Sequence, residues 1–90
     1  MAQKLVANPK YVSTLVKALR KAIPGAQIDR ERVRRDRYRF IVVASKFERW
    51  GHPERQRLVW DIVGRVLEKQ DILKVAMILT MSRKEFLSYK

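Results

Sequence analysis

The sequence predicts a small α+β fold, a two-layer sandwich in which helices cover a three-stranded sheet. Two segments, residues 9–22 and 53–69, have apolar residues at helical spacing. Two others, 38–44 and 71–81, are rich in the β-branched, aromatic and aliphatic residues of strands, and a charged segment precedes the first of them. We therefore expect the order αββαβ, followed by a short C-terminal helix.

Size and composition favour one domain. The chain has 90 residues, of which 47% are hydrophobic and 33% charged, so it has enough apolar content to fold around one modest core. We expect residues 1–8 to be a flexible lead-in and residues 9–90 to form the domain.

The first helix is expected at residues 9–22. Asn8 followed by Pro9 is typical of an N-cap and a proline at the first helical position, where the missing N–H costs nothing. Pro24 and Gly25 end the pattern. The face that packs on the sheet is formed by Val12, Leu15, Val16, Leu19 and Ile23.

The next two strands are expected to form a hairpin with its turn near residues 34–36. Residues 38–44 are largely apolar on both faces, whereas Ile28 and Val33 are the only aliphatic residues between Gln27 and Arg37. The charged segment is therefore predicted to be an edge strand, because charges at a sheet edge oppose association with other edges.

The second helix is expected at residues 53–69. Pro53 suits its first turn, Glu54 suits the positive end of its dipole, and we expect His52 to cap or abut it. Its core face is formed by Val59, Ile62, Val63 and Val66.

The last strand is expected to be buried, with alternate residues on its two faces. One face is formed by Leu73, Val75, Met77 and Leu79, and the other by Ala76 and Ile78. Ser82 and Glu85 have the spacing of a capping box, which opens a short helix whose Phe86 is expected to dock on the core.

Three segments, in this order and spacing, resemble the BolA-like family, whose fold is similar to the type II KH domain. They are FIVVASKF at 40–47, RQRLVW at 55–60 and KVAMILTMSRKEF at 74–86. The likeness runs from about Leu15 to Phe86, most of the chain. The resemblance implies a BolA-like/KH-like arrangement of the helices and strands.

The resemblance also implies a role that this sequence does not support, the sharing of an iron–sulfur cluster with a monothiol glutaredoxin. Gln56 stands where the family has a histidine in its Arg-His-Arg segment, and Lys74 stands where it has the histidine that can ligate the cluster. The hairpin sequence RVRRDR offers neither histidine nor cysteine. Because an ammonium group cannot replace a neutral imidazole as an iron ligand, we expect no cluster ligation.

The sequence also gives no indication of catalysis, a cofactor or a metal site. One histidine and no cysteine cannot supply the usual zinc ligands. No serine lies in a nucleophile motif, and Gly25, Gly51 and Gly64 are too scattered to form a phosphate-binding loop. The G-x-x-G clamp of KH domains is missing as well. We expect neither an enzyme nor a membrane protein, and a cytoplasmic location.

Positive charge is the strongest indication of function. Lysine and arginine number 21 against nine acidic residues, a net charge of +12 that attracts polyanions. Arginine is concentrated between residues 30 and 39, and its planar guanidinium suits bidentate contact with phosphate. We expect one contact surface formed by Arg32, Arg34, Arg35, Arg37, Arg39, Lys46, Arg49, Trp50, Arg55 and Arg57.

Two of these assignments have alternatives. Trp50 either stacks on an exposed base or forms a lid on the core, and the hairpin arginines are either a binding surface or a solvated edge. We expect a non-catalytic domain that binds RNA or DNA mainly through phosphates, as a monomer or weak dimer. The alternative is a protein-interaction adaptor for an acidic partner, without iron–sulfur ligation.

Overall fold

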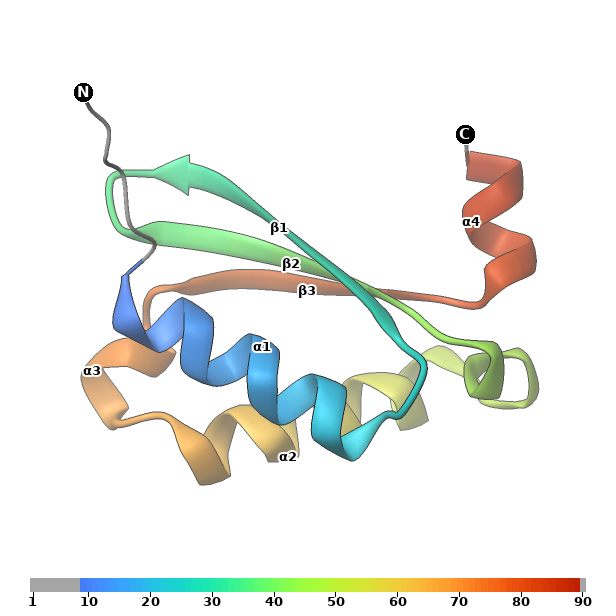
Figure 1. The fold of residues 1–90 in the computed structure, drawn as a ribbon, viewed down its shortest axis with the longest axis horizontal. Coiled ribbons are helices and arrows are strands. Elements are labelled where there is room, and N and C mark those ends of the chain that lie inside the picture. Colours follow the sequence, from blue (N-terminus) through green and yellow to red (C-terminus); the bar gives the residue numbers. More distant parts are fainter. Residues whose placement is uncertain (1–8, 90) are drawn as a thin grey trace.

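The structure is a computed structural model that describes residues 9–89. Its elements, drawn in Figure 1, are α1 (Lys10–Ala22), β1 (Gln27–Arg34), β2 (Arg37–Val43), the 3-10 helix η1 (Ser45–Arg49), α2 (His52–Val66), α3 (Lys69–Ile72), β3 (Val75–Met81) and α4 (Arg83–Tyr89). The predicted α+β class and order are confirmed, and η1 and α3 are additions to them. The lead-in expected at residues 1–8, with Asn8 as N-cap, lies outside the described residues.

The helix α1 begins one residue later than expected. Pro9 is its N-cap rather than its first helical residue, and the Pro9 carbonyl accepts the N–H of Val12 at 2.9 Å. Gly25 completes the turn toward β1 with a φ of 85°, a backbone conformation that glycine adopts without strain.

The three strands form one sheet in the order β1-β2-β3. β1 and β2 are antiparallel, with a turn at residues 35–36, whereas β2 and β3 are parallel and are connected through η1, α2 and α3. Ile28 of β1 pairs with Val42 of β2, and both are buried. Because paired residues point to the same face of a sheet, this register determines which arginines of the hairpin share a face.

An irregularity in β3 changes which of its residues are buried. Tyr38 pairs with Val75, but the next residue, Arg39, pairs with Met77, so β3 contains one extra residue at this point. Val75 and Ile78 are consequently both buried, whereas Met77 is 44% exposed. The expected face of Leu73, Val75, Met77 and Leu79 is therefore wrong, because the bulge breaks strict alternation and Leu73 precedes the strand.

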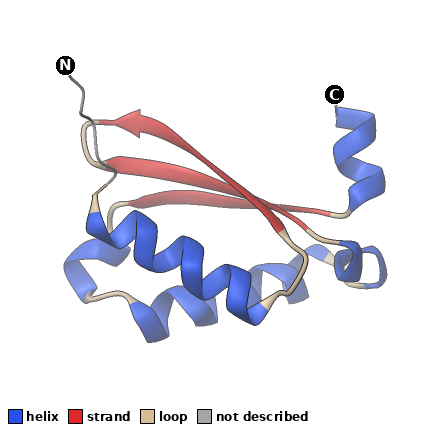
Figure 2. Ribbon diagram, viewed as in Figure 1, coloured by secondary structure: helices blue, strands red, loops and turns tan. Residues whose placement is uncertain are grey.

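The core lies on one side of the sheet. Figure 2 shows α1, α2 and α3 all on this side, and the largest fully buried side chains include Phe40, Phe47, Leu15 and Leu19. α2 starts at His52, which is exposed, and the preceding Gly51 N–H donates to Glu54 Oε1 at 2.9 Å. α2 ends earlier than expected, and Leu67 then continues in an extended conformation with its side chain in the core.

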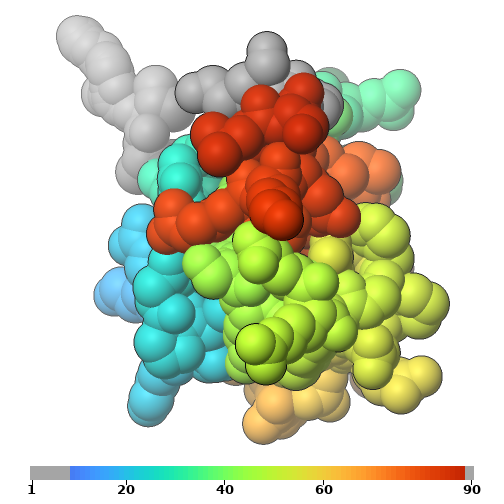
Figure 3. Space-filling view, turned by 90° about the vertical axis from the view of Figure 1, so that its right-hand side faces the viewer, coloured from blue at the N-terminus to red at the C-terminus, as the bar shows by residue number. Residues whose placement is uncertain are grey.

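The helix α4 projects from the end of β3 on the side opposite to the other helices (Figure 1). Its predicted capping box is confirmed: the Ser82 N–H donates to Glu85 Oε1 at 2.8 Å, and the Glu85 N–H donates to Ser82 Oγ at 3.1 Å. Phe86 is half-buried and lies outside the core cluster, contrary to expectation. Figure 3 shows α4, in red, directly above η1, in yellow-green, and the two helices are in contact.

Candidate nucleic-acid interface

The candidate residues lie in two groups, not on the single surface that we expected. Arg32, Arg34, Arg35 and Arg37 surround the β1–β2 turn, and we call these four residues the arginine tip. Lys46, Arg49, Trp50 and Arg57 lie on η1 and the start of α2. Figure 1 places these groups at opposite ends of the long axis. The strand β2 separates them, and its seven residues span roughly 20 Å.

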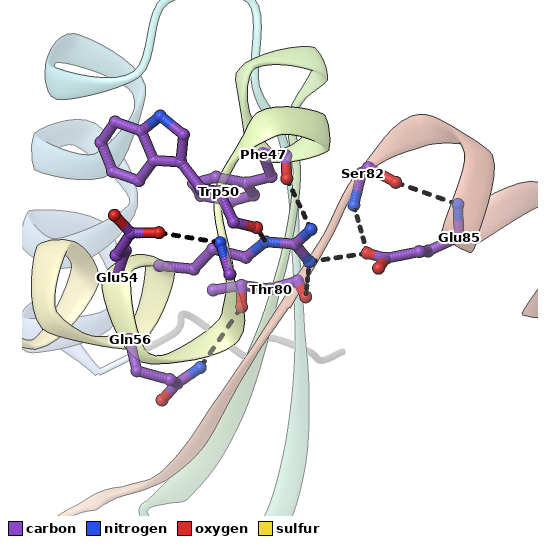
Figure 4. A network of polar contacts seen from close by, with 9 residues as sticks. Phe47, Trp50, Glu54, Gln56, Thr80, Ser82 and Glu85 are labelled. Carbon is purple, nitrogen blue, oxygen red and sulfur yellow. Dashed lines mark hydrogen bonds and ion pairs between the residues drawn. The ribbon is translucent and has the colours of Figure 1, made fainter.

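Arg55, a predicted phosphate contact, is buried and serves a structural role. Its guanidinium donates to the carbonyl oxygens of Phe47, Trp50 and Thr80, and to Glu85 Oε1 at 2.6 Å (Figure 4). Only 4% of the residue is exposed. It therefore joins η1, α2, β3 and α4, and no phosphate can reach it. Position 55 lies four residues before the buried Val59, a spacing from which this burial could have been recognised.

The hydrogen bonds around Arg55 also keep its acidic partner, Glu85, ionised. The hydrogen bond from Arg55, followed by that from the Ser82 N–H, lowers the pKa of Glu85 from 4.5 to about 2. Glu85 therefore remains a carboxylate throughout the physiological range. The ion pair between Arg55 and Glu85 therefore attaches α4 to α2.

Arg39 is partly neutralised, so its place in the expected surface is also corrected. It is directly opposite Glu31 in the β1–β2 register and forms an ion pair with it. Such a cross-strand pair stabilises the hairpin, because opposite charges face one another on one side of the sheet. Arg39 is therefore not the free cation that we expected, because its charge is paired with Glu31.

The arginine tip, in contrast, has no such compensation. All four of its arginines are exposed, and within residues 9–89 no ion pair involves them. Arg34 is directly opposite Arg37, an arrangement of like charges that destabilises a hairpin. Asp36, the acidic residue of the turn, pairs instead with Lys74 at 3.6 Å. A hollow of about 420 Å³ is lined by Arg34, Arg35, Asp36 and Arg37.

The turn that presents these arginines is held by Tyr11, which is not among the predicted site residues. The Tyr11 hydroxyl lies 2.6 Å from the carbonyl oxygen of Asp36, to which it donates, and 3.2 Å from that of Lys74. Its ring meets that of Tyr38 edge-on, with centroids 6.3 Å apart. Burial, followed by the charge of Asp36, raises the pKa of Tyr11 to about 12. Tyr11 precedes Leu15 and Leu19 at helical spacing, which indicates a core-facing position.

The second group is less suited to a polyanion. Lys46, Arg49 and Arg57 are exposed, and the Lys46 Nζ lies 5.1 Å from the centre of the Trp50 ring. Trp50 is half-buried and packs against the core, which supports its role as a lid. Its ring also borders a hollow of about 400 Å³ whose lining includes Glu54 and Asp61, two carboxylates that repel phosphate.

The two positions that hold histidines in the BolA-like family make internal contacts here. Gln56 Nε2 donates to the carbonyl oxygen of Ile78 at 2.9 Å, and Gln56 Oε1 accepts from the Trp60 indole at 3.0 Å. Lys74 pairs with Asp71 at 3.3 Å as well as with Asp36. Over residues 9–89, no cluster of histidine, cysteine and acidic side chains is arranged to hold a metal ion, and no helix is long and apolar enough to cross a membrane.

The chain is similar in structure to a bol-like protein from Babesia bovis. The two structures superpose with a TM-score of 0.54 over 98% of each chain, at 15% sequence identity. No protein-family model and no curated protein sequence matches the chain. The likeness shows the fold alone.

Proposed function

We propose that this protein is a non-catalytic nucleic-acid-binding domain that contacts phosphates through the arginine tip. The observation that supports the proposal is the uncompensated pair of Arg34 and Arg37 across the hairpin. Like charges in this position oppose folding, and no carboxylate among the described residues pairs with either of them. A phosphate between the two guanidinium groups relieves the repulsion and accepts two charge-assisted hydrogen bonds.

The charge of the whole chain adds a longer-range attraction. A net charge of +12 raises the rate at which a polyanion meets the surface. Lys46, Arg49 and Arg57 contribute to this field, although they lie too far from the arginine tip to share one phosphate with it. Contacts to phosphate are independent of base sequence, so we expect an affinity that falls steeply with salt.

Salt-titrated binding to duplex DNA, single-stranded DNA and RNA tests the proposal. The variant Arg34→Gln, Arg35→Gln, Arg37→Gln removes three charges from the tip. We expect it to reduce the slope of log affinity against log salt by up to about 2.7 on duplex DNA, about 0.9 for each lost phosphate contact. The matched control removes the same charge from the exposed face of α1, as Lys17→Gln, Arg20→Gln, Lys21→Gln. No binding to any of the three nucleic acids at about 50 mM salt, or equal losses in the two variants, would end the proposal.

A second candidate function, a protein-interaction adaptor, is supported by a different surface. The face of the sheet opposite the core presents Met77, which is 44% exposed, beside the half-buried Ile41 and Leu79. An acidic partner with an apolar ridge is complementary to this strip and to the cations around it. A defined protein retained from nuclease-treated lysate by the wild type, and lost with Met77→Glu, would favour this function.

A further inference from the structure

We propose that the arginine tip inserts arginine side chains into the minor groove of A·T-rich duplex DNA. This inference depends on the proposed function, and it adds the kind of nucleic acid, the groove and the base composition that the tip recognises.

The type of cation in the hairpin favours a groove. Every basic residue between positions 30 and 39 is arginine, whereas three of the four basic residues of α1 are lysine. Lysine is sufficient for a simple attraction to phosphate, but an ammonium group is strongly hydrated. A guanidinium group is less hydrated, and arginine is therefore attracted into the narrow, strongly negative minor groove of A-tracts.

The directions in which the arginine side chains leave the hairpin also favour a groove. Arg32 pairs with Tyr38, which is buried on the helix side, so Arg32 emerges on that side. Arg37 is adjacent to Tyr38 and therefore emerges on the opposite side, together with its partner Arg34. Arg35 lies in the turn between them. The tip thus presents cations on both of its sides and at its end.

This distribution fits a groove better than a flat array of phosphates. The minor groove of B-DNA is about 6 Å wide, which admits an arginine side chain but not a two-stranded ribbon. With the turn seated over the groove, a side chain at the end enters it while those on either side reach the two flanking phosphate chains. Val33, an aliphatic residue between Arg32 and Arg34, is 51% exposed and is placed to contact the apolar sugar walls.

The arginine tip is already held in place in the protein alone. The Tyr11 hydroxyl and the Lys74 ammonium hold the turn at Asp36 from α1 and from the segment before β3. A loop fixed in its binding conformation loses little entropy when it binds. Duplex RNA is a poorer partner, because its minor groove is wide and shallow and its major groove is too deep and narrow for side chains to read.

Fluorescence anisotropy with duplexes of equal length tests the inference. We expect the wild type to bind an A·T-rich duplex about tenfold more tightly than a G·C-rich duplex or duplex RNA. A minor-groove-binding polyamide should displace it from the A·T-rich duplex. The charge-conserving variant Arg34→Lys, Arg35→Lys, Arg37→Lys should lose the A·T preference while its affinity for the G·C-rich duplex stays within about twofold.

The outcomes separate the two proposals. Equal affinity of the wild type for the two DNA duplexes, resistance to the polyamide, or an unchanged preference in the lysine variant would overturn the minor-groove inference and leave the proposed function standing. Absence of binding to every duplex and single strand would overturn both. The polyamide competition uses the wild type, so this result does not depend on the folding of a variant.

Discussion

Replacing Arg55 by alanine removes the side chain that joins four elements of the fold. The change removes the guanidinium donor from the buried carbonyl oxygens of Phe47 and Thr80. It also removes this donor from the Trp50 carbonyl oxygen and from Glu85 Oε1. It also removes the guanidinium group that lies 5.6 Å from the centre of the Phe47 ring. The backbone of α2 itself has no reason to change, since alanine is a good helix former.

The expected cost is about 3–4 kcal/mol in the free energy of unfolding. Each of the two buried carbonyl groups that loses the charged donor contributes about 1–2 kcal/mol, and the Phe47 carbonyl lies at the lower end because it keeps the Trp50 N–H at 3.2 Å. The lost contact with the ring contributes about 0.5–1 kcal/mol. The ion pair adds little to this sum, because the Glu85 side chain is 43% exposed and solvent screens its charge. For a domain of this size the melting temperature should fall by about 12–30 °C.

Urea denaturation followed by circular dichroism measures this loss. Arg57→Ala is the matched control, since Arg57 is exposed on the same turn of α2 and should change stability by no more than about 0.5 kcal/mol. A loss below about 1 kcal/mol for Arg55→Ala, or equal losses for the two variants, would refute the reasoning. At a temperature where Arg55→Ala remains folded, its salt slope for nucleic-acid binding should equal that of the wild type.

Three further expectations follow from the same contacts. The depressed pKa of Glu85 gives a stabilisation that is complete above pH 4.5 and is lost as the pH falls toward about 2. Glu85→Gln should therefore flatten the curve of unfolding free energy against pH in this window. The raised pKa of Tyr11 gives a stabilisation that is complete below pH 10 and is lost as the pH rises toward about 12. Tyr11→Phe should remove this alkaline loss, lower the free energy of unfolding at pH 7 by about 1 kcal/mol and speed hydrogen exchange at the β1–β2 turn. Unchanged exchange at the turn would contradict the role of Tyr11 in holding it. Iron reconstitution with a monothiol glutaredoxin should give no coloured complex that contains this chain, because Gln56 and Lys74 stand where the family has histidines and neither side chain replaces an imidazole as an iron ligand. A stable coloured complex of the two proteins would contradict this expectation.

The order of helices and strands could be predicted because it depends on local signals. The apolar spacing of α1 and α2, the dense apolar run of β2 and the Ser82–Glu85 box each act over a few residues. The bulge in β3 could not be predicted in this way. It depends on the partner strand, since only the pairing of Tyr38 with Val75 and of Arg39 with Met77 reveals the extra residue.

The candidate site was less predictable for a related reason. Composition reveals that arginines are abundant but not which of them find partners. Arg39 meets Glu31 across the hairpin, and Arg55 meets Glu85 thirty residues later in the chain, so both pairings arise only from the fold. The distance between the arginine tip and Lys46 likewise depends on β2 being a single uninterrupted strand.

The contacts of Arg55 and Gln56 with β3 have a consequence for assembly. The Met81 carbonyl accepts a hydrogen bond from the Ala44 N–H at the end of β2, so the alternate carbonyls of Ile78 and Thr80 point outward. The side chains of Gln56 and Arg55 already occupy those two acceptors. A fourth strand would have to displace both donors before it could pair with these two residues, which opposes lateral growth of the sheet at this edge.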